Sequence, residues 1–160
     1  MIEVGSIVQY IALIARSGLG FNEQPPHTQR TTTLTQRIIN TPNAPAAVGA
    51  YNQGKQIGSF LQLSGQLAID PATGNIMKAG IAEQTKQSLS QLSTLLADAG
   101  ASWHDVLITR VYLASDDDFD EFDKAYSGSV PQPYPARVTV GAQLAPGALV
   151  EIGALAIVPA

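Results

Sequence analysis

The most regular hydrophobic pattern in the chain lies between Ile81 and Ala99 and predicts an amphipathic helix. Its apolar positions recur at intervals of three and four residues, which places them along one side of a helix; they are Leu89, Leu92, Leu95, Leu96 and Ala99, with Ser88 in the same stripe. Glu83 falls in the first turn, where a negative charge is favourable, and Gly100 follows as a stop signal.

A second, shorter helix is predicted downstream. The acidic run at residues 116–118 is interpreted as its N-terminal cap, and the apolar side is formed by Phe119, Phe122, Ala125 and Tyr126. Gly128 ends the helix. The acidic run lacks the glycine and the final glutamate of an EF-hand loop, so a solvated cap is favoured over a calcium site.

The other apolar segments are predicted to be strands. They cover residues 34–39, 51–57, 60–69, 106–113, 134–140 and 148–158. Gly58-Ser59 predicts a hairpin turn between the second and third strands, and Ala145-Pro146-Gly147 predicts a turn between the last two. Within the third strand, Ser64-Gly65 is expected to allow a bulge or a close backbone approach.

This order of elements predicts an α+β domain whose two helices lie on one face of a mixed sheet. Because side chains of a strand alternate between faces, part of the apolar set must point away from the helices. The sequence contains no third layer that would cover that face. We therefore expect other copies of the chain to cover it, with binding sites at the seams between copies.

The last two strands each carry one charged residue in an apolar run. Arg137 lies in YPARVTV, and Glu151 is the only acid downstream of it. If the two strands are neighbours, the pair can hold a small anion and transfer a proton, because arginine binds a carboxylate through two hydrogen bonds. The alternative interpretation is a cross-strand ion pair on a solvated face. Apolar neighbours such as Val140 and Ile152 predict central, well-covered strands and favour the functional interpretation.

Composition narrows the chemistry that the chain can carry. It has no cysteine, which excludes disulfides, thiolate nucleophiles and cysteine-based zinc sites. His27 and His104 lie far apart in sequence, which argues against a histidine-based triad or metal site. The net charge of −4 argues against general nucleic-acid binding. An active site here is expected to use Arg, Glu, Tyr, hydroxyls, backbone groups and water.

Residues 1–33 are predicted to be an accessory tail and residues 34–160 the domain. The apolar run at residues 7–15 is too short to span a bilayer, and Glu3 fits neither a signal peptide nor a mitochondrial presequence well. We expect a cytoplasmic protein, with a mitochondrial location as the less favoured alternative. The run at residues 7–15 is interpreted either as a short docking helix or as an addition upstream of a complete domain.

Several segments together resemble the reactive-intermediate deaminase family, also called the Rid or YjgF family. The matching segments are NAPAAVGAYNQG (residues 43–54), LQLSGQLAIDPATG (61–74), EQTKQSLSQLSTLLADAG (83–100), the strand at 106–113, YPARVTV (134–140) and LVEIGALAIV (149–158). Each is weakly specific by itself, but their shared order is specific. The resemblance implies a chorismate-mutase-like fold, a homotrimer with sites between subunits, and hydrolysis of 2-imino acids to 2-oxo acids and ammonia without a cofactor.

The resemblance also implies a role for each matching residue. Arg137 matches the arginine that binds the substrate carboxylate, and Glu151 matches the acid that activates water. Tyr51 matches a tyrosine that reaches the site from the neighbouring subunit. Gly65 matches a glycine whose backbone contacts substrate, with Ser64 beside it, and Thr139 matches a residue whose carbonyl helps to place the water.

The chain departs from the family pattern near these positions. Gly153 replaces a frequent second glutamate, Val138 a serine, Asp123 an asparagine and Ala50 a proline. Substrate preference is therefore open, and so is a second class of function: a trimeric protein that binds carboxylate metabolites without turnover. Both functions imply small 2-imino or 2-oxo acids as ligands and neither implies a nucleic acid or a membrane.

Overall fold

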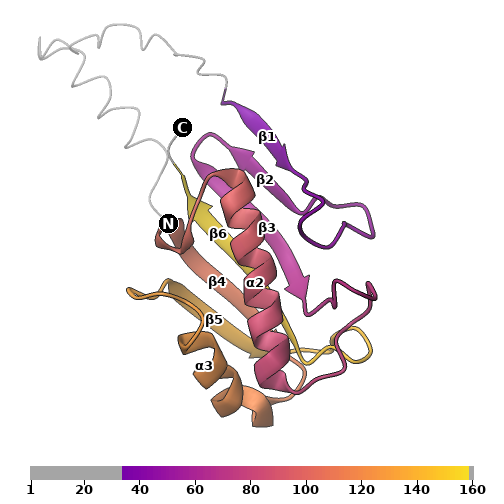
Figure 1. Ribbon diagram of the computed structural model, residues 1–160. Helices are drawn as coiled ribbons and strands as arrows, with labels where there is room; N and C mark the ends of the chain where they lie inside the picture. Colours follow the sequence, from indigo (N-terminus) through magenta and orange to yellow (C-terminus); the bar gives the residue numbers. More distant parts are fainter. Residues whose placement is uncertain (1–33, 159–160) are drawn as a thin grey trace, which may run out of the picture. The chain divides into compact units, whose positions relative to one another are not determined.

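The computed structural model describes residues 34–158, which form a six-stranded sheet in the order β1-β2-β3-β6-β4-β5 (Figure 1). The strands are β1 (Gln36–Ile39), β2 (Gly54–Ile57), β3 (Phe60–Leu67), β4 (Val106–Leu113), β5 (Ala136–Gly141) and β6 (Val150–Ile157). Among them β4 and β5 run parallel and the other neighbours antiparallel. The predicted tail at residues 1–33 lies outside the described residues.

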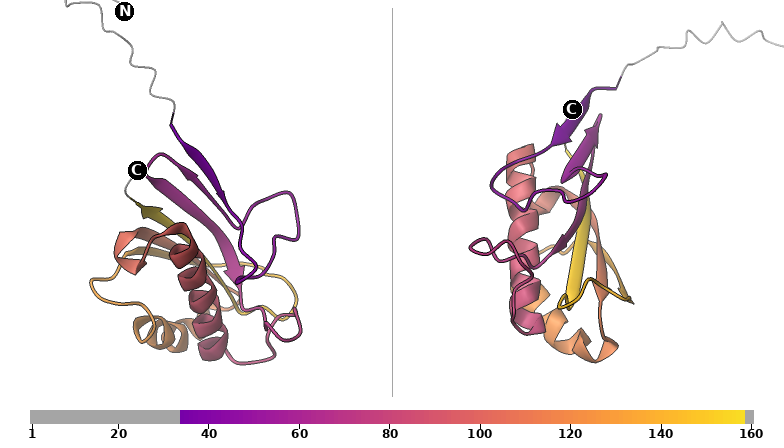
Figure 2. Two further views of the ribbon diagram at one scale, coloured as in Figure 1. Left: turned by 45° about the horizontal axis from the view of Figure 1, so that its top comes forward. Right: turned by 90° about the vertical axis from the view of Figure 1, so that its right-hand side faces the viewer.

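Helices α2 (Ile81–Ala99) and α3 (Phe119–Ser127) lie on the same side of this sheet, as the edge view in Figure 2 shows. Two short 3-10 turns, η1 (Trp103–Asp105) and η2 (Asp116–Asp118), precede β4 and α3. The prediction of an α+β fold with two helices on one face of a mixed sheet is confirmed. No helix among residues 34–158 is long and apolar enough to cross a membrane.

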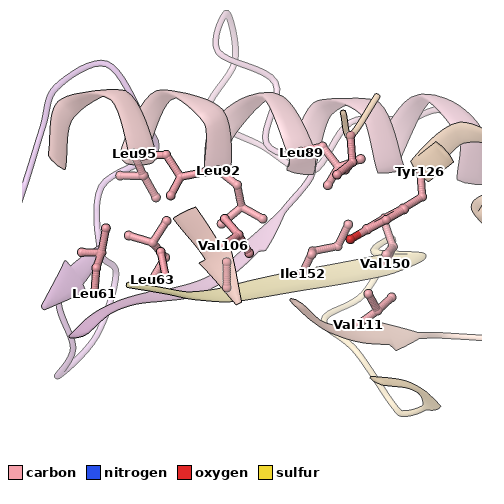
Figure 3. Packing of buried hydrophobic residues seen from close by; sticks show 14 of the residues in the cluster. Leu61, Leu63, Leu89, Leu92, Leu95, Val106, Val111, Tyr126, Val150 and Ile152 are labelled. Carbon is pink, nitrogen blue, oxygen red and sulfur yellow. The ribbon is translucent and has the colours of Figure 1, made fainter. Parts of the chain in front are cut away.

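The core lies between α2 and the central strands. Leu92 and Leu95 of α2 point toward Leu63 of β3, and Leu89 points toward Ile152 of β6 (Figure 3). All five side chains are at most 2% exposed. Burying each of them contributes about 1.5–3 kcal/mol to folding, so this contact between helix and sheet stabilises the fold strongly.

Helix α2 begins at Ile81 and ends at Ala99, as the sequence pattern predicts. Gly100 takes φ 78°, and its N–H bonds to carbonyls of the last turn, as expected of a glycine stop. At α3 the acidic run does not act as predicted. Residues 116–118 form η2, and the hydroxyl of Ser115 accepts from the N–H of Asp117, so the hydroxyl caps this turn and no acidic side chain does.

The opposite face of the sheet is largely apolar. Phe60 and Ile157 lie directly opposite each other on β3 and β6, and Val138 and Val140 lie on β5. These four side chains are 39–59% exposed in the single chain. β6 is central as predicted, but β5 is one of the two edge strands of the sheet, so the prediction that both C-terminal strands are well covered was wrong for β5.

Candidate functional site

A cavity of about 670 Å³ lies where β3 extends past the end of β2. The β2 strand pairs only with residues 60–63 of β3, so residues 64–67 face the loop that precedes β2. Val48, Leu67 and Ile69 give the cavity an apolar wall. Its polar groups come from Tyr51, Ser64, Gln66, Gln91 and Glu151. A concave apolar site with a few polar groups is typical of small-molecule binding.

Glu151 enters this cavity across Gly65. The register between β3 and β6 shifts between Leu63 and Gln66, so that Leu67 lies opposite Glu151. A Cβ atom at Gly65 would lie 2.8 Å from Cδ and 2.9 Å from Cγ of Glu151. Only glycine therefore leaves room for the carboxylate in this position. The predicted bulge and close approach at Ser64-Gly65 are confirmed.

The loop that carries Tyr51 is held by a buried glutamine. Gln53 is 2% exposed, and its Oε1 accepts from the N–H of Thr41 at 2.6 Å. Its Nε2 lies 2.8–3.1 Å from the carbonyl oxygens of Thr41, Ala44 and Pro45. These bonds set the path of the loop, so that residues 51–53 lie outside β2. The predicted strand at 51–57 was therefore too long, and Tyr51 belongs to the loop.

Ser64 joins the same loop to β3. Its N–H donates to the Gln53 carbonyl at 3.0 Å, and its hydroxyl donates to the Asn52 carbonyl at 2.6 Å. Because the hydroxyl proton is used in this bond, the Ser64 oxygen faces a ligand as an acceptor. Tyr51 is half exposed at the mouth of the cavity, where its phenolic oxygen accepts from the N–H of Val48 at 3.3 Å.

Arg137 does not reach this cavity. Strand β4 separates β5 from β6, so the condition that the strands of Arg137 and Glu151 be neighbours is not met. Tyr112 of β4 lies opposite both Glu151 and Val140, which places these three on one face. Arg137 comes three residues before Val140, and successive side chains alternate, so Arg137 points to the helix side.

The guanidinium of Arg137 instead packs against α3. Its Nη2 lies 2.7 Å from Oδ1 of Asp123. Its Cζ lies 4.8 Å from the ring centre of Tyr126, 5.3 Å from that of Phe122 and 5.9 Å from that of Phe119. Such cation–π contacts fix the guanidinium at the outer edge of the sheet. Thr139 lies two residues further along β5, on the same side as Arg137.

A buried hydrogen bond joins Tyr126, one of these three aromatic residues, to strand β4. The hydroxyls of Thr109 and Tyr126 lie 2.9 Å apart, and both residues are buried. Burial raises the pKa of the Tyr126 phenol, because a phenolate would lose its hydration, while the Thr109 bond and the Arg137 charge act in the opposite direction. The phenol therefore stays neutral over the physiological range.

The structure thus brings together Tyr51, Ser64, Gly65 and Glu151 and leaves Arg137 and Thr139 apart from them. Sequence reasoning missed Gln53, because a glutamine before a strand gives no sign that it will be buried. It noted Asp123 only as a departure from the family pattern. Among residues 34–158 no group of His, Asp and Glu side chains is arranged to hold a metal ion.

Comparison with known proteins gives a consistent set of relatives. The model of the family described as Endoribonuclease L-PSP matches residues 41–158. A RutC family protein of Pyrococcus abyssi is 38% identical, over 77% of this chain and 98% of its own length. The 2-iminobutanoate/2-iminopropanoate deaminase of Bos taurus is 36% identical, over 78% of this chain and 92% of its own length.

Solved structures share the fold. The crystal structure of E. coli TdcF with bound serine is 32% identical and has a TM-score of 0.70. The similarity covers 76% of this chain and 98% of that one. The family match at residues 41–158 contains strands β2 to β6, both helices and all of the residues that line the cavity, and it leaves out β1.

Proposed function

The chain belongs to the Endoribonuclease L-PSP family, also called the Rid or YjgF family, and we propose that it hydrolyses 2-imino acids to 2-oxo acids and ammonia. The observation that carries this proposal is the carboxylate of Glu151, which lies against Gly65 in an otherwise mainly apolar cavity. Relatives named 2-iminobutanoate/2-iminopropanoate deaminase support the reaction class.

The proposed reaction needs a positioned water and one proton-transfer group. Glu151 takes a proton from water as the water oxygen bonds to C2 of the imine, and the C=N electron pair moves to nitrogen. Glu151 then returns the proton to nitrogen. As the C–N bond breaks, Glu151 takes the proton of the hydroxyl and passes it to the nitrogen, so that the oxygen becomes the carbonyl of the 2-oxo acid and the nitrogen leaves as ammonia. An imine carbon is already electrophilic, so positioning and one general base suffice.

We further propose that the carboxylate anchor comes from a second copy of the chain. Neighbouring strands lie about 4.8 Å apart, and Arg137 and Glu151 lie on opposite faces with β4 between them. A four-carbon acid cannot contact both within one chain. A site between copies would combine Glu151, Tyr51, Ser64 and Gly65 of one chain with Arg137 and Thr139 of another.

Two variants separate catalysis from binding. Glu151→Gln keeps the shape of the side chain but removes the base, so we expect turnover to fall by about 10²-fold or more while affinity for 2-oxobutanoate changes little. Arg137→Ala should abolish both turnover and binding of 2-oxobutanoate, because loss of a charge-assisted bidentate contact costs about 2–5 kcal/mol. Glu83→Gln, an exposed position on α2, is the matched control.

Turnover is measured with 2-iminobutanoate that a threonine dehydratase generates in place, in competition with semicarbazide. If Glu151→Gln deaminates at the wild-type rate, Glu151 is not the base. The second candidate function, binding of carboxylate metabolites without turnover, would apply if the wild-type chain bound 2-oxobutanoate and showed no deamination. A ribonuclease role is not proposed for this chain, because its net charge of −4 gives no electrostatic attraction for RNA.

A further inference from the structure

We propose that Asp123 competes with the ligand carboxylate for Arg137 and so lowers the affinity of the site for 2-imino and 2-oxo acids. The inference rests on the proposed function, in which Arg137 anchors the ligand. It concerns a residue that does not line the cavity and plays no part in the proton transfer. Asp123 would act as a specificity-determining residue, since it sets how strongly the anchor attracts an anion.

The ion pair uses only part of the guanidinium. Nη2 of Arg137 contacts Oδ1 of Asp123 at 2.7 Å, and among residues 34–158 the guanidinium makes no other ion pair or hydrogen bond. Arginine binds a carboxylate best through two parallel N–H groups. A ligand that takes both must share Nη2 with Asp123 or displace it.

The two partners differ in how firmly they are held. The side chain of Arg137 is 24% exposed, and its guanidinium packs on the rings of Tyr126 and Phe122. The Asp123 side chain is 46% exposed, so water can solvate its carboxylate when the ion pair opens. The carboxylate of a ligand can therefore replace that of Asp123 while Arg137 stays in place. The two carboxylates then compete for the same guanidinium.

The charge around the anchor acts in the same direction. The positive charge of Arg137 is balanced by Asp123, so an incoming anion meets a neutral pair. Repulsion between two partly exposed carboxylates a few ångströms apart is modest but measurable.

The test measures binding of 2-oxobutanoate to the full chain by titration calorimetry. Asp123→Asn keeps an oxygen that can accept from Nη2 but removes the charge, so we expect its dissociation constant to fall about three- to fivefold, the factor of one exposed charge pair. The difference should shrink at high salt. In turnover assays KM should fall by more than kcat changes, because the change acts on ground state and transition state alike.

The matched control is Asp120→Asn, an exposed acid on the same helix that makes no ion pair with Arg137, which should leave the dissociation constant within about 1.5-fold. Unchanged or weaker binding by Asp123→Asn, together with loss of binding by Arg137→Ala, would overturn the inference and leave the proposed function standing. Equal binding by wild type and Arg137→Ala would instead overturn the anchor role of Arg137, and with it this inference and the proposed site between copies.

Discussion

At the scale of single residues, Gly65 and Glu151 act as one unit. The missing side chain of Gly65 creates the space that the Glu151 carboxylate occupies, and the shift in register between β3 and β6 brings the two together. The group that would be displaced by a Cβ is the flexible end of a side chain. A larger residue at position 65 therefore acts on the position of the carboxylate more than on the fold.

Gly65→Ala is accordingly expected to cut imine hydrolysis at least about tenfold, because even a small displacement of a general base is costly. The free energy of unfolding should change by less than about 1 kcal/mol, since Glu151 can rotate away. The control is Gly153→Ala, where an added Cβ would meet its nearest atom, the Leu63 carbonyl oxygen, at 3.5 Å. Urea unfolding and the coupled deaminase assay check both values, and a fully active Gly65→Ala variant would contradict this account.

Because of Tyr126, the stability of the fold is expected to decrease as the pH rises into the alkaline range. Its folded pKa is raised above the ordinary value of 10.0, so the unfolded chain ionises first as the pH rises. Stability from this group is complete below pH 10 and is lost as the pH rises toward the folded pKa. We expect the melting temperature to fall less between pH 9 and pH 11 in Tyr126→Phe than in wild type.

The phenylalanine variant also leaves Thr109 without its partner, which should lower stability at pH 7 by about 1–2 kcal/mol. Thermal unfolding over the pH series measures both effects. Parallel curves for the two proteins would mean that Tyr126 is not the group that ionises.

At the scale of elements, α2 depends on β1 for its C-terminal cap. Its last turn contains no basic residue of its own. Arg37 of β1 fills that role: Nη1 donates to the Ala99 carbonyl at 3.2 Å and Nη2 to the Asp98 carbonyl at 2.8 Å. A positive charge at a helix C-terminus satisfies free carbonyls and is favourable to the helix dipole. Strand β1, one of the two edge strands, is thereby connected to the helix that covers the core.

Removing this cap should loosen both elements. Arg37→Ala is expected to lower the free energy of unfolding by about 1–2 kcal/mol, the cost of two charge-assisted bonds at a partly exposed site. Amide exchange should increase in β1 and in the last turn of α2 and remain unchanged in β4. Lys55→Ala, an exposed cation on the neighbouring strand β2, is the control and should change stability by less than about 0.5 kcal/mol.

At the scale of the whole molecule, the helix-free face of the sheet and the divided site lead to the same expectation. Phe60, Val140 and Ile157 expose apolar surface on one face, and the residues that would complete the site lie on opposite faces. Association of copies would cover the apolar face of the sheet and would complete the site. We therefore expect the protein to be a trimer at micromolar concentration.

Sedimentation velocity tests this expectation. Val140→Asp places a charge on the helix-free face and should shift the protein toward monomer with loss of turnover. Ala97→Asp, on the exposed side of α2, should leave the trimer intact. A wild-type monomer with full activity would be incompatible with a site shared between copies.

The sequence by itself determined the elements whose pattern is local. The bounds of α2 agree with its leucine periodicity and with Gly100, and β4 spans the predicted residues 106–113. Period and stop signals are properties of consecutive residues, so they can be read without knowing the partners. The same holds for the close approach expected at Gly65, because glycine in an apolar strand marks such a place.

Only the tertiary structure decided which elements meet. In the folded chain β4 lies between β5 and β6, and the long-range hydrogen bonds of Gln53 hold the loop that contains Tyr51. Arg137 forms an ion pair with Asp123. An alternating pattern states which residues share a face but not which strand lies beside it, since any two such strands can pair through their backbones. Strand order follows from the packing of distant apolar faces, and it is this order that separates Arg137 from Glu151.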